Sequence, residues 1–300
     1  MDFASLHNAI LLLTSGVTGK TTAAGRTGKD MAAAVLLACF VLIWIPKTRT
    51  ETVSFRDRGL TSIPFDQINN QVTTLQIAKN NISVVDTFIF YPDLETLWFG
   101  SNLLSIFPNL CNLNSSLEQL GLKSNYITHI PPERLDCLVS LRTLGLAENK
   151  LSSFPAVSGP GKSLTYLSIE YNRFEEFPDL TGVSENLRNV LAGYNQFDTI
   201  NRKKLKTPKI VPLKLELSGN SNLTTISNLG FWNLKHLDVK GIGLTCDSSI
   251  GWIKMVETAG LVVKIDSKPC ASLSKLITRE WTDIQLQELL RQGIMQFTNY

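Results

Sequence analysis

The sequence predicts an α/β solenoid, a right-handed horseshoe with a concave parallel β-sheet and an irregular or short-helical convex side. Two observations predict this fold. The phrase L-x-x-L-x-L-x-x-N-x-L recurs at intervals of 22 to 25 residues, and apolar residues alternate within each copy. Alternation of this kind is typical of a short strand with one buried face. One such unit cannot bury that face alone, so neighbouring units are expected to stack around a shared core.

Eight copies of the phrase follow one another along the chain. They begin at Val72, Leu94, Leu117, Leu141, Leu164, Leu187, Pro212 and Leu234. A partial copy, "TVSFRDRGLTSIP", precedes them at Thr52. By this spacing and these residue types the chain is identified as a leucine-rich repeat protein. We assign residues 51–245 to a solenoid of about eight to nine repeats.

An asparagine occupies the ninth position of seven of these copies. Because the chain reverses there, backbone groups would otherwise be left unpaired, and an inward-turned amide can bond them. We therefore interpret these asparagines as structural. They are Asn80, Asn102, Asn125, Asn149, Asn172, Asn195 and Asn220.

Residues 1–50 are expected to be a leader. The run "MAAAVLLACFVLIWIP" at 31–46 carries no charge and follows three basic residues, Lys20, Arg26 and Lys29. A basic region before a short apolar region is the pattern of a secretory signal. The segment after it offers no A-x-A cleavage site, so an uncleaved signal anchor stays open as the alternative. Met31 could be the true start.

Residues 246–300 are expected to form a C-terminal cap and an amphipathic tail helix. The stretch "LTCDSSIGWIKMVETAGLVVKIDSKPCASL" resembles the cysteine-flanked cap of extracellular leucine-rich repeat proteins. The resemblance implies one disulfide between Cys246 and Cys270, with Trp252 packed as core. This stretch departs from the family's pattern in two ways: Ser248 replaces a cysteine, and no fourth cysteine is present. The repeats themselves resemble those of animal extracellular proteins of this class.

Cys111 and Cys137 lie 26 residues apart on the convex sides of consecutive repeats. In a secreted chain a bridge between them is expected, and two separate thiols are the alternative. The tail "TDIQLQELLRQ" has Thr282 and Gln285 at capping-box spacing. Its amphipathic helix is expected to pack on the end of the solenoid rather than to bind a partner or a membrane.

Composition argues against catalysis and against nucleic-acid binding. The formal net charge is +3, and the chain has three histidines. No zinc spacing of cysteine and histidine occurs, so we predict no metal and no cofactor. Gly19-Lys20-Thr21 would need a glycine at Thr14 to form a phosphate-binding loop. A hydrolase using Ser218, His236 and Asp238 on the concave face is kept as a remote alternative.

The concave face offers a candidate binding site, here called the concave patch. The middle column of the sheet is predicted to read Gln76, Trp98, Gly121, Gly145, Ser168, Leu191, Glu216 and Asp238. An exposed tryptophan beside two glycines has the composition of an interface hot spot. The alternative is that Trp98 folds down over the glycines and shields the sheet. The concave patch comprises Trp98, Gly121, Tyr166, Glu170, Tyr171, Leu191 and Tyr194.

Two further surface features accompany the repeats. N-x-[ST] sequons occur at Asn81, Asn114 and Asn222, each near a turn after a strand. The basic run "RKKLKTPK" contains Arg202, Lys203, Lys204 and Lys206. Such a run is commonly just solvated, and its sharper interpretation is a site for an anionic polysaccharide.

Together these features predict a non-catalytic recognition protein, secreted or at the cell surface. Its concave sheet would present a broad face to a protein or glycan ligand. The membrane would be contacted only through residues 31–46, if they are not cleaved. An intracellular scaffold with reduced cysteines is the second alternative.

Overall fold

The computed structural model describes residues 51–85, 88, 91–156, 163–180, 183, 186–200, 213–226, 234–245, 248–270 and 279–291. Contacts divide the chain into two units, Met1–Arg49 and Thr50–Tyr300, and the description below concerns the second. The expected leader, residues 1–50, therefore lies outside the described residues.

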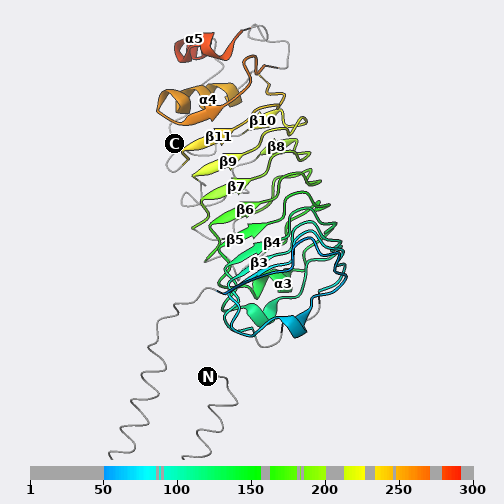
Figure 1. The fold of residues 1–300 in the computed structure, drawn as a ribbon. Helices are drawn as coiled ribbons and strands as arrows, with labels where there is room; N and C mark the ends of the chain where they lie inside the picture. The colour runs from blue at the N-terminus through cyan, green and yellow to red at the C-terminus, as the bar shows by residue number, and fades with distance from the viewer. Residues whose placement is uncertain are drawn as a thin grey trace, which may run out of the picture. The chain divides into compact units, whose positions relative to one another are not determined.

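A parallel sheet runs the length of the second unit, and Figure 1 shows its strands side by side like the rungs of a ladder. Ten strands of the described residues form it in chain order. They are β1 (Thr52–Ser54), β2 (Thr74–Gln76), β3 (Thr96–Trp98), β4 (Gln119–Gly121), β5 (Thr143–Gly145), β6 (Tyr166–Ser168), β7 (Asn189–Leu191), β9 (Lys214–Glu216), β11 (His236–Asp238) and β12 (Val262–Lys264). The fold is the predicted leucine-rich repeat horseshoe.

The sheet is longer at both ends than the eight full repeats require. The partial copy at Thr52 supplies β1, which pairs with β2. Beyond the last repeat, β12 comes from the segment assigned to the cap and pairs with β11. Each terminal repeat therefore has a further parallel strand on its outer edge, which satisfies backbone groups that an open edge would expose.

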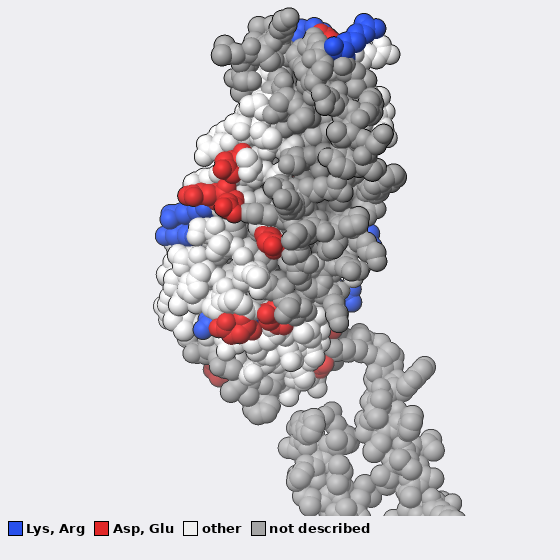
Figure 2. Space-filling view, turned by 180° about the vertical axis from the view of Figure 1, so that it is seen from behind, with Lys and Arg blue, Asp and Glu red and all other residues white. Residues whose placement is uncertain are grey.

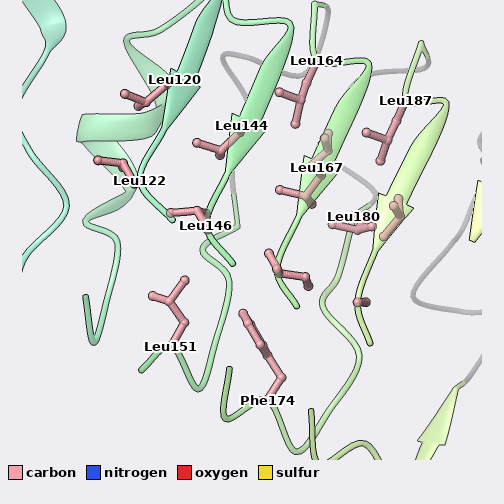
Figure 3. Close-up of a cluster of buried hydrophobic side chains, with 14 of the residues drawn as sticks. Leu120, Leu122, Leu144, Leu146, Leu151, Leu164, Leu167, Phe174, Leu180 and Leu187 are labelled. Carbon is pink, nitrogen blue, oxygen red and sulfur yellow. The ribbon is translucent and has the colours of Figure 1, made fainter. Parts of the chain in front are cut away.

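The register of the strands is set by the repeated leucines. Leu120, Leu144 and Leu167 are direct partners on β4, β5 and β6, and each is fully buried. Figure 3 shows these side chains pointing to the same side of the sheet, together with leucines from the segments before and after the strands. One continuous core results, as stacking requires.

The asparagines of the ninth position form an internal ladder. The side-chain amide of Asn149 donates to the backbone oxygens of Leu122 and Leu146, both at 3.0 Å. Its oxygen accepts from the backbone N–H of Ile127 at 3.0 Å. Each amide thus joins its own coil to the preceding one. The same pattern of donation recurs at Asn80, Asn102, Asn125, Asn172, Asn195 and Asn220.

The residue before each asparagine has left-handed backbone. Tyr171 and Tyr194, for example, have φ of 52° and 54°. This conformation is unfavourable for a bulky residue, and the turn needs it to point the following asparagine inward. Glycine, which adopts it without strain, occupies the position at Gly219 and Gly241.

The convex side of the described residues is built from short pieces, as predicted. They are the 3₁₀ turns η2 (Phe65–Gln67) and η3 (Cys111–Leu113), the helix α3 (Pro132–Asp136), and two short strands, β8 (Thr199–Ile200) and β10 (Thr225–Ile226). The strands β8 and β10 pair with each other in parallel, which the repeat pattern did not predict. A disulfide joins Cys111 and Cys137, whose Cα atoms are 5.4 Å apart, and ties two consecutive coils together.

Two helices cover the C-terminal end of the core. In α4 (Ser248–Thr258), Trp252 is buried and its indole N–H donates to the backbone oxygen of Ile226 at 2.7 Å. After the 3₁₀ turn η6 (Trp281–Asp283) comes α5 (Leu286–Arg291), which packs against α4. Ile284 and Leu289 are fully buried there. The tail helix therefore packs against α4.

Candidate binding surface on the concave sheet

The register of the strands aligns side chains of the concave face in columns. The middle column is the one predicted, because Trp98 pairs with Gly121, Gly121 with Gly145, and Gly145 with Ser168. The next column, two positions beyond the strand ends, has small residues at Ala78, Gly100 and Ala147, with Lys123 between the last two. The N-terminal half of the face therefore carries few large side chains.

A hollow of about 480 Å³ lies over this part of the face. Its floor is made of backbone and small side chains of β4 and β5, and its large aromatic residues are Trp98 and Tyr166. It is lined by Arg56, Ala78, Trp98, Gly100, Gly121, Lys123, Thr143, Gly145, Ala147, Tyr166 and Ser168. Its size is that of a pocket for a small ligand or a few side chains of a partner.

The indole ring of Trp98 lies over Gly121. A Cβ atom placed on Gly121 would come within 2.2 Å of Cε3 of Trp98, so any side chain there would displace the ring. Gly145 differs, because a Cβ atom there would meet no atom outside its chain neighbours closer than 3.8 Å. Trp98 thus shields one glycine, as the alternative interpretation held, and the other glycine keeps the floor open.

Two tyrosines stack at the edge of the face. The rings of Tyr171 and Tyr194 are 4.3 Å apart and nearly parallel, at 6°. Each side chain is about half exposed, at 47% and 49%. The ring of Tyr194 in turn covers Gly219, where a Cβ atom would come within 2.5 Å of its Cδ1. Large, rigid aromatic surface of this kind is enriched in interface hot spots.

The carboxylate of Glu170 lies near Tyr166 and Tyr171, since its charge acts on both phenols. The hydroxyl of Ser168 donates to it at 3.1 Å. Burial raises the pKa of Glu170 above its usual value, and the charge of nearby Glu216 raises it further. Burial also raises the pKa of the Tyr166 phenol, with Glu170 as the next cause. Both groups are therefore partly removed from water.

The lysines of the face are paired. Lys123 contacts Glu148 at 3.0 Å, and the hydrogen bond to that carboxylate raises the pKa of Lys123. Lys214 contacts Glu216 at 2.7 Å, with the same effect on its pKa. These pairs neutralise much of the charge that flanks the aromatic residues.

The predicted concave patch is brought together unevenly. Trp98 and Tyr166 line the hollow, and Glu170 accepts a hydrogen bond from its lining residue Ser168. Tyr171 and Tyr194 form a separate stack. Two other predicted members are poorly accessible. Gly121 is buried under Trp98, and the side chain of Leu191 retains 9% of its surface.

Several residues of the hollow were missed by the sequence analysis. Arg56, Lys123, Thr143 and Ala147 line it, and Gly219 supports the tyrosine stack. Reading the column beyond the strands, as the middle column was read, would have found Lys123 and Ala147. Nothing in the sequence indicated which way the ring of Tyr194 leans.

The three residues of the alternative hydrolase do not form a hydrogen-bonded set. Asp238 accepts from the backbone N–H of Lys240 at 3.2 Å and lies 3.6 Å from Lys264. Among the described residues, no hydrogen bond links it to His236 or links His236 to Ser218. A nucleophile and its base must be within hydrogen-bond reach, which this arrangement does not provide. Within the described residues no group of three potential metal ligands was found.

The structure describes some of the other predicted sites, and the rest lie outside the described residues. Asn81, Asn114 and Asn222 are all exposed. Cys270 is disulfide-bonded, and its expected partner Cys246 lies outside the described residues. The basic residues Arg202, Lys203, Lys204 and Lys206 also lie outside them. In the described part of the chain no helix has the length and apolar character needed to cross a membrane.

Charged side chains do not mark one broad site. On the described part of the face in Figure 2, acidic and basic groups lie in small clusters of either sign, separated by uncharged surface.

Comparisons with known proteins agree with this fold. A family model described as leucine rich repeat matches residues 112–151. No match was found among curated proteins. Among solved structures, the Toll chain of the Drosophila Toll–Spatzle complex is similar, with a TM-score of 0.54 and 18% identity over 73% of this chain and 32% of that chain. The chain thus spans about a third of the length of the Toll chain.

Two bacterial structures are also similar. Internalin C2 from Listeria monocytogenes has 20% identity and a TM-score of 0.48, over 72% of this chain and 80% of that chain. The leucine-rich repeat domain of a Shigella effector has 19% identity and a TM-score of 0.45, over 88% and 98%. The sheet, the asparagine ladder and the family match together define the fold as a leucine-rich repeat solenoid.

Proposed function

We propose that this protein is a non-catalytic recognition protein that binds a protein ligand on its concave sheet. The observation that carries the proposal is the hollow lined by Trp98 and Tyr166, whose floor is backbone and small side chains. The stacked Tyr171 and Tyr194 extend the same surface. Partly exposed aromatic rings next to an open floor suit the central contacts of an interface.

The likeness to Toll, a protein solved in complex with Spatzle, supports a protein as the ligand class. A glycan ligand is the second candidate, because aromatic rings can also bind sugars through their apolar faces. An anionic polysaccharide at Arg202, Lys203, Lys204 and Lys206 belongs to this second candidate.

The concave patch can be tested by one substitution. The full chain, produced by secretory cells, serves as bait against an arrayed panel of purified cell-surface and secreted proteins. For a partner found in this way, Trp98→Ala is expected to weaken binding at least about thirtyfold, as loss of a central aromatic residue does. The melting temperature should fall by no more than about 4 °C, because roughly 1 kcal/mol of packing over Gly121 is lost.

Tyr126→Ala is the matched control. Tyr126 is 46% exposed and contacts Lys150 through its ring face, but it lies beyond the asparagine turn, away from the concave columns. Its removal should leave binding unchanged. A partner that tolerates Trp98→Ala and is lost with Tyr126→Ala would place the interface elsewhere and overturn the proposal.

We further propose that the protein is secreted or held at the cell surface. Support comes from the Cys111–Cys137 disulfide, the disulfide-bonded state of Cys270 and three exposed sequons. Disulfides persist in oxidising compartments. Peptide mapping without reduction, on protein from its native cells, should recover Cys111 linked to Cys137, Cys246 linked to Cys270, and glycan on at least one of Asn81, Asn114 and Asn222. Free thiols and bare sequons throughout would favour the intracellular scaffold.

A further inference from the structure

Trp98 on β3 and Tyr166 on β6 line the hollow from opposite sides of β4 and β5. The ring of Trp98 leans over Gly121 on β4, and Tyr166 starts from β6. The strand between them, β5, carries Gly145 in the middle column, with no side chain to fill the gap. Since neighbouring strands lie about 4.8 Å apart, β4 and β6 are separated by roughly 10 Å.

The carboxylate of Glu170 lies next to the hollow, one hydrogen bond away from its lining residue Ser168, and makes no ion pair among the described residues. Glu170 follows β6 in the same column as Lys123 and Ala147 of the hollow. The nearest lysines are engaged, since Lys123 contacts Glu148 and Lys214 contacts Glu216.

A partly buried anion of this kind is costly unless a cation meets it. Removing a carboxylate from water penalises its charged form, and the pKa of Glu170 is raised for that reason. A cation that enters the hollow would offset this cost. Aromatic rings at the same place add attraction, because the face of a tryptophan or tyrosine ring is negative.

The remaining cation of the hollow does not oppose this arrangement strongly. Arg56 belongs to the first coil, and Glu170 to the sixth, so about five strand spacings, or roughly 24 Å, separate their backbones. Because the Arg56 side chain itself lines the hollow, a bound cation would have to lie at the Tyr166 end, away from Arg56. Arg56 makes no salt bridge among the described residues and is exposed.

We propose that the hollow receives a cationic side chain of a protein partner, an arginine or a lysine, between Trp98 and Tyr166, where Glu170 neutralises its charge. This inference rests on the proposed function and names the chemistry of its ligand. A planar guanidinium fits best, because it stacks on aromatic rings and pairs with a carboxylate in one geometry.

The test uses a small probe, so no partner needs to be known. N-acetyl-arginine amide is titrated into the full chain labelled with ¹⁵N-tryptophan, and the indole signal of Trp98 is assigned with a Trp98→Phe variant. The signal should shift saturably at millimolar concentration, the range expected for a single side chain. N-acetyl-citrulline amide, which has the same shape without the charge, should bind at least about tenfold more weakly. The indole signals of the buried Trp252 and Trp281 serve as internal references.

Glu170→Gln keeps the shape of the side chain and removes its charge. The substitution should weaken binding of the arginine probe at least about tenfold. Asp238→Asn is the matched control, because Asp238 is a concave carboxylate that already lies beside Lys264. It should leave the titration unchanged. Equal binding of the citrulline probe, no saturable shift, or indifference to Glu170→Gln would each overturn the inference. A protein partner whose binding is weakened by Trp98→Ala but not by Glu170→Gln would overturn this inference. The proposed function would still stand.

Discussion

Asn149→Ala is expected to lower the free energy of unfolding by about 3 kcal/mol. The substitution removes donors to Leu122 and Leu146 and the acceptor of the Ile127 N–H. All three partner groups are backbone groups in the dry interior, and water cannot replace the lost amide. Each unsatisfied buried group costs about 1–3 kcal/mol.

Urea denaturation followed by circular dichroism measures this effect, and thermal unfolding should show a midpoint lower by about 6–12 °C. The control is Asn189→Ala. Asn189 lies on β7, and its side chain is half-buried on the concave face. Among the described residues, this side chain makes no hydrogen bond. That variant should change stability by less than about 0.5 kcal/mol. If both variants lose the same stability, the ladder of amides does not hold the coils together as inferred.

Leu144→Ala is expected to cost about 3 kcal/mol, within the range of 2–5 kcal/mol seen for buried leucines. Leu144 is fully buried between its register partners Leu120 and Leu167, and Figure 3 shows it at the centre of the cluster. Because coils contact mainly their neighbours, a cavity in β5 weakens the interfaces on both of its sides.

The same urea titration measures this loss, with Val84→Ala as the control. Val84 is apolar but 68% exposed, so trimming it should change stability by less than about 0.5 kcal/mol. A Leu144→Ala protein as stable as the Val84→Ala protein would mean that the stacked leucines do not supply the stability of the solenoid.

Most of the fold could be predicted because the repeat fixes it position by position. The leucines at 120 and 122 face the core and Gly121 faces outward, and this alternation alone sets the register of β4 against β3 and β5. What the repeat does not contain could not be predicted this way. β8 and β10 lie outside the eleven-residue phrase on which the copies were aligned, and the strand β12 lies in the segment assigned to the cap.

The candidate site was predictable by column but not by side-chain conformation. The alignment placed Trp98 beside Gly121, yet it left open whether the ring covers the glycine or stands free of it. The structure shows the ring over Gly121. The stacking of Tyr171 on Tyr194 depends likewise on rotamers and on neighbouring coils, which no single repeat encodes. The same holds for Glu170, which makes no ion pair among the described residues.

The most direct test of recognition by the concave sheet is hydroxyl-radical footprinting of the full chain with and without its partner, read by mass spectrometry. The partly exposed aromatic side chains report their own accessibility. Oxidation of Trp98, Tyr171 and Tyr194 should fall on binding, while oxidation of Tyr126, beyond the asparagine turn, should stay the same. Protection of Tyr126 with unchanged oxidation of Trp98, Tyr171 and Tyr194 would contradict the account.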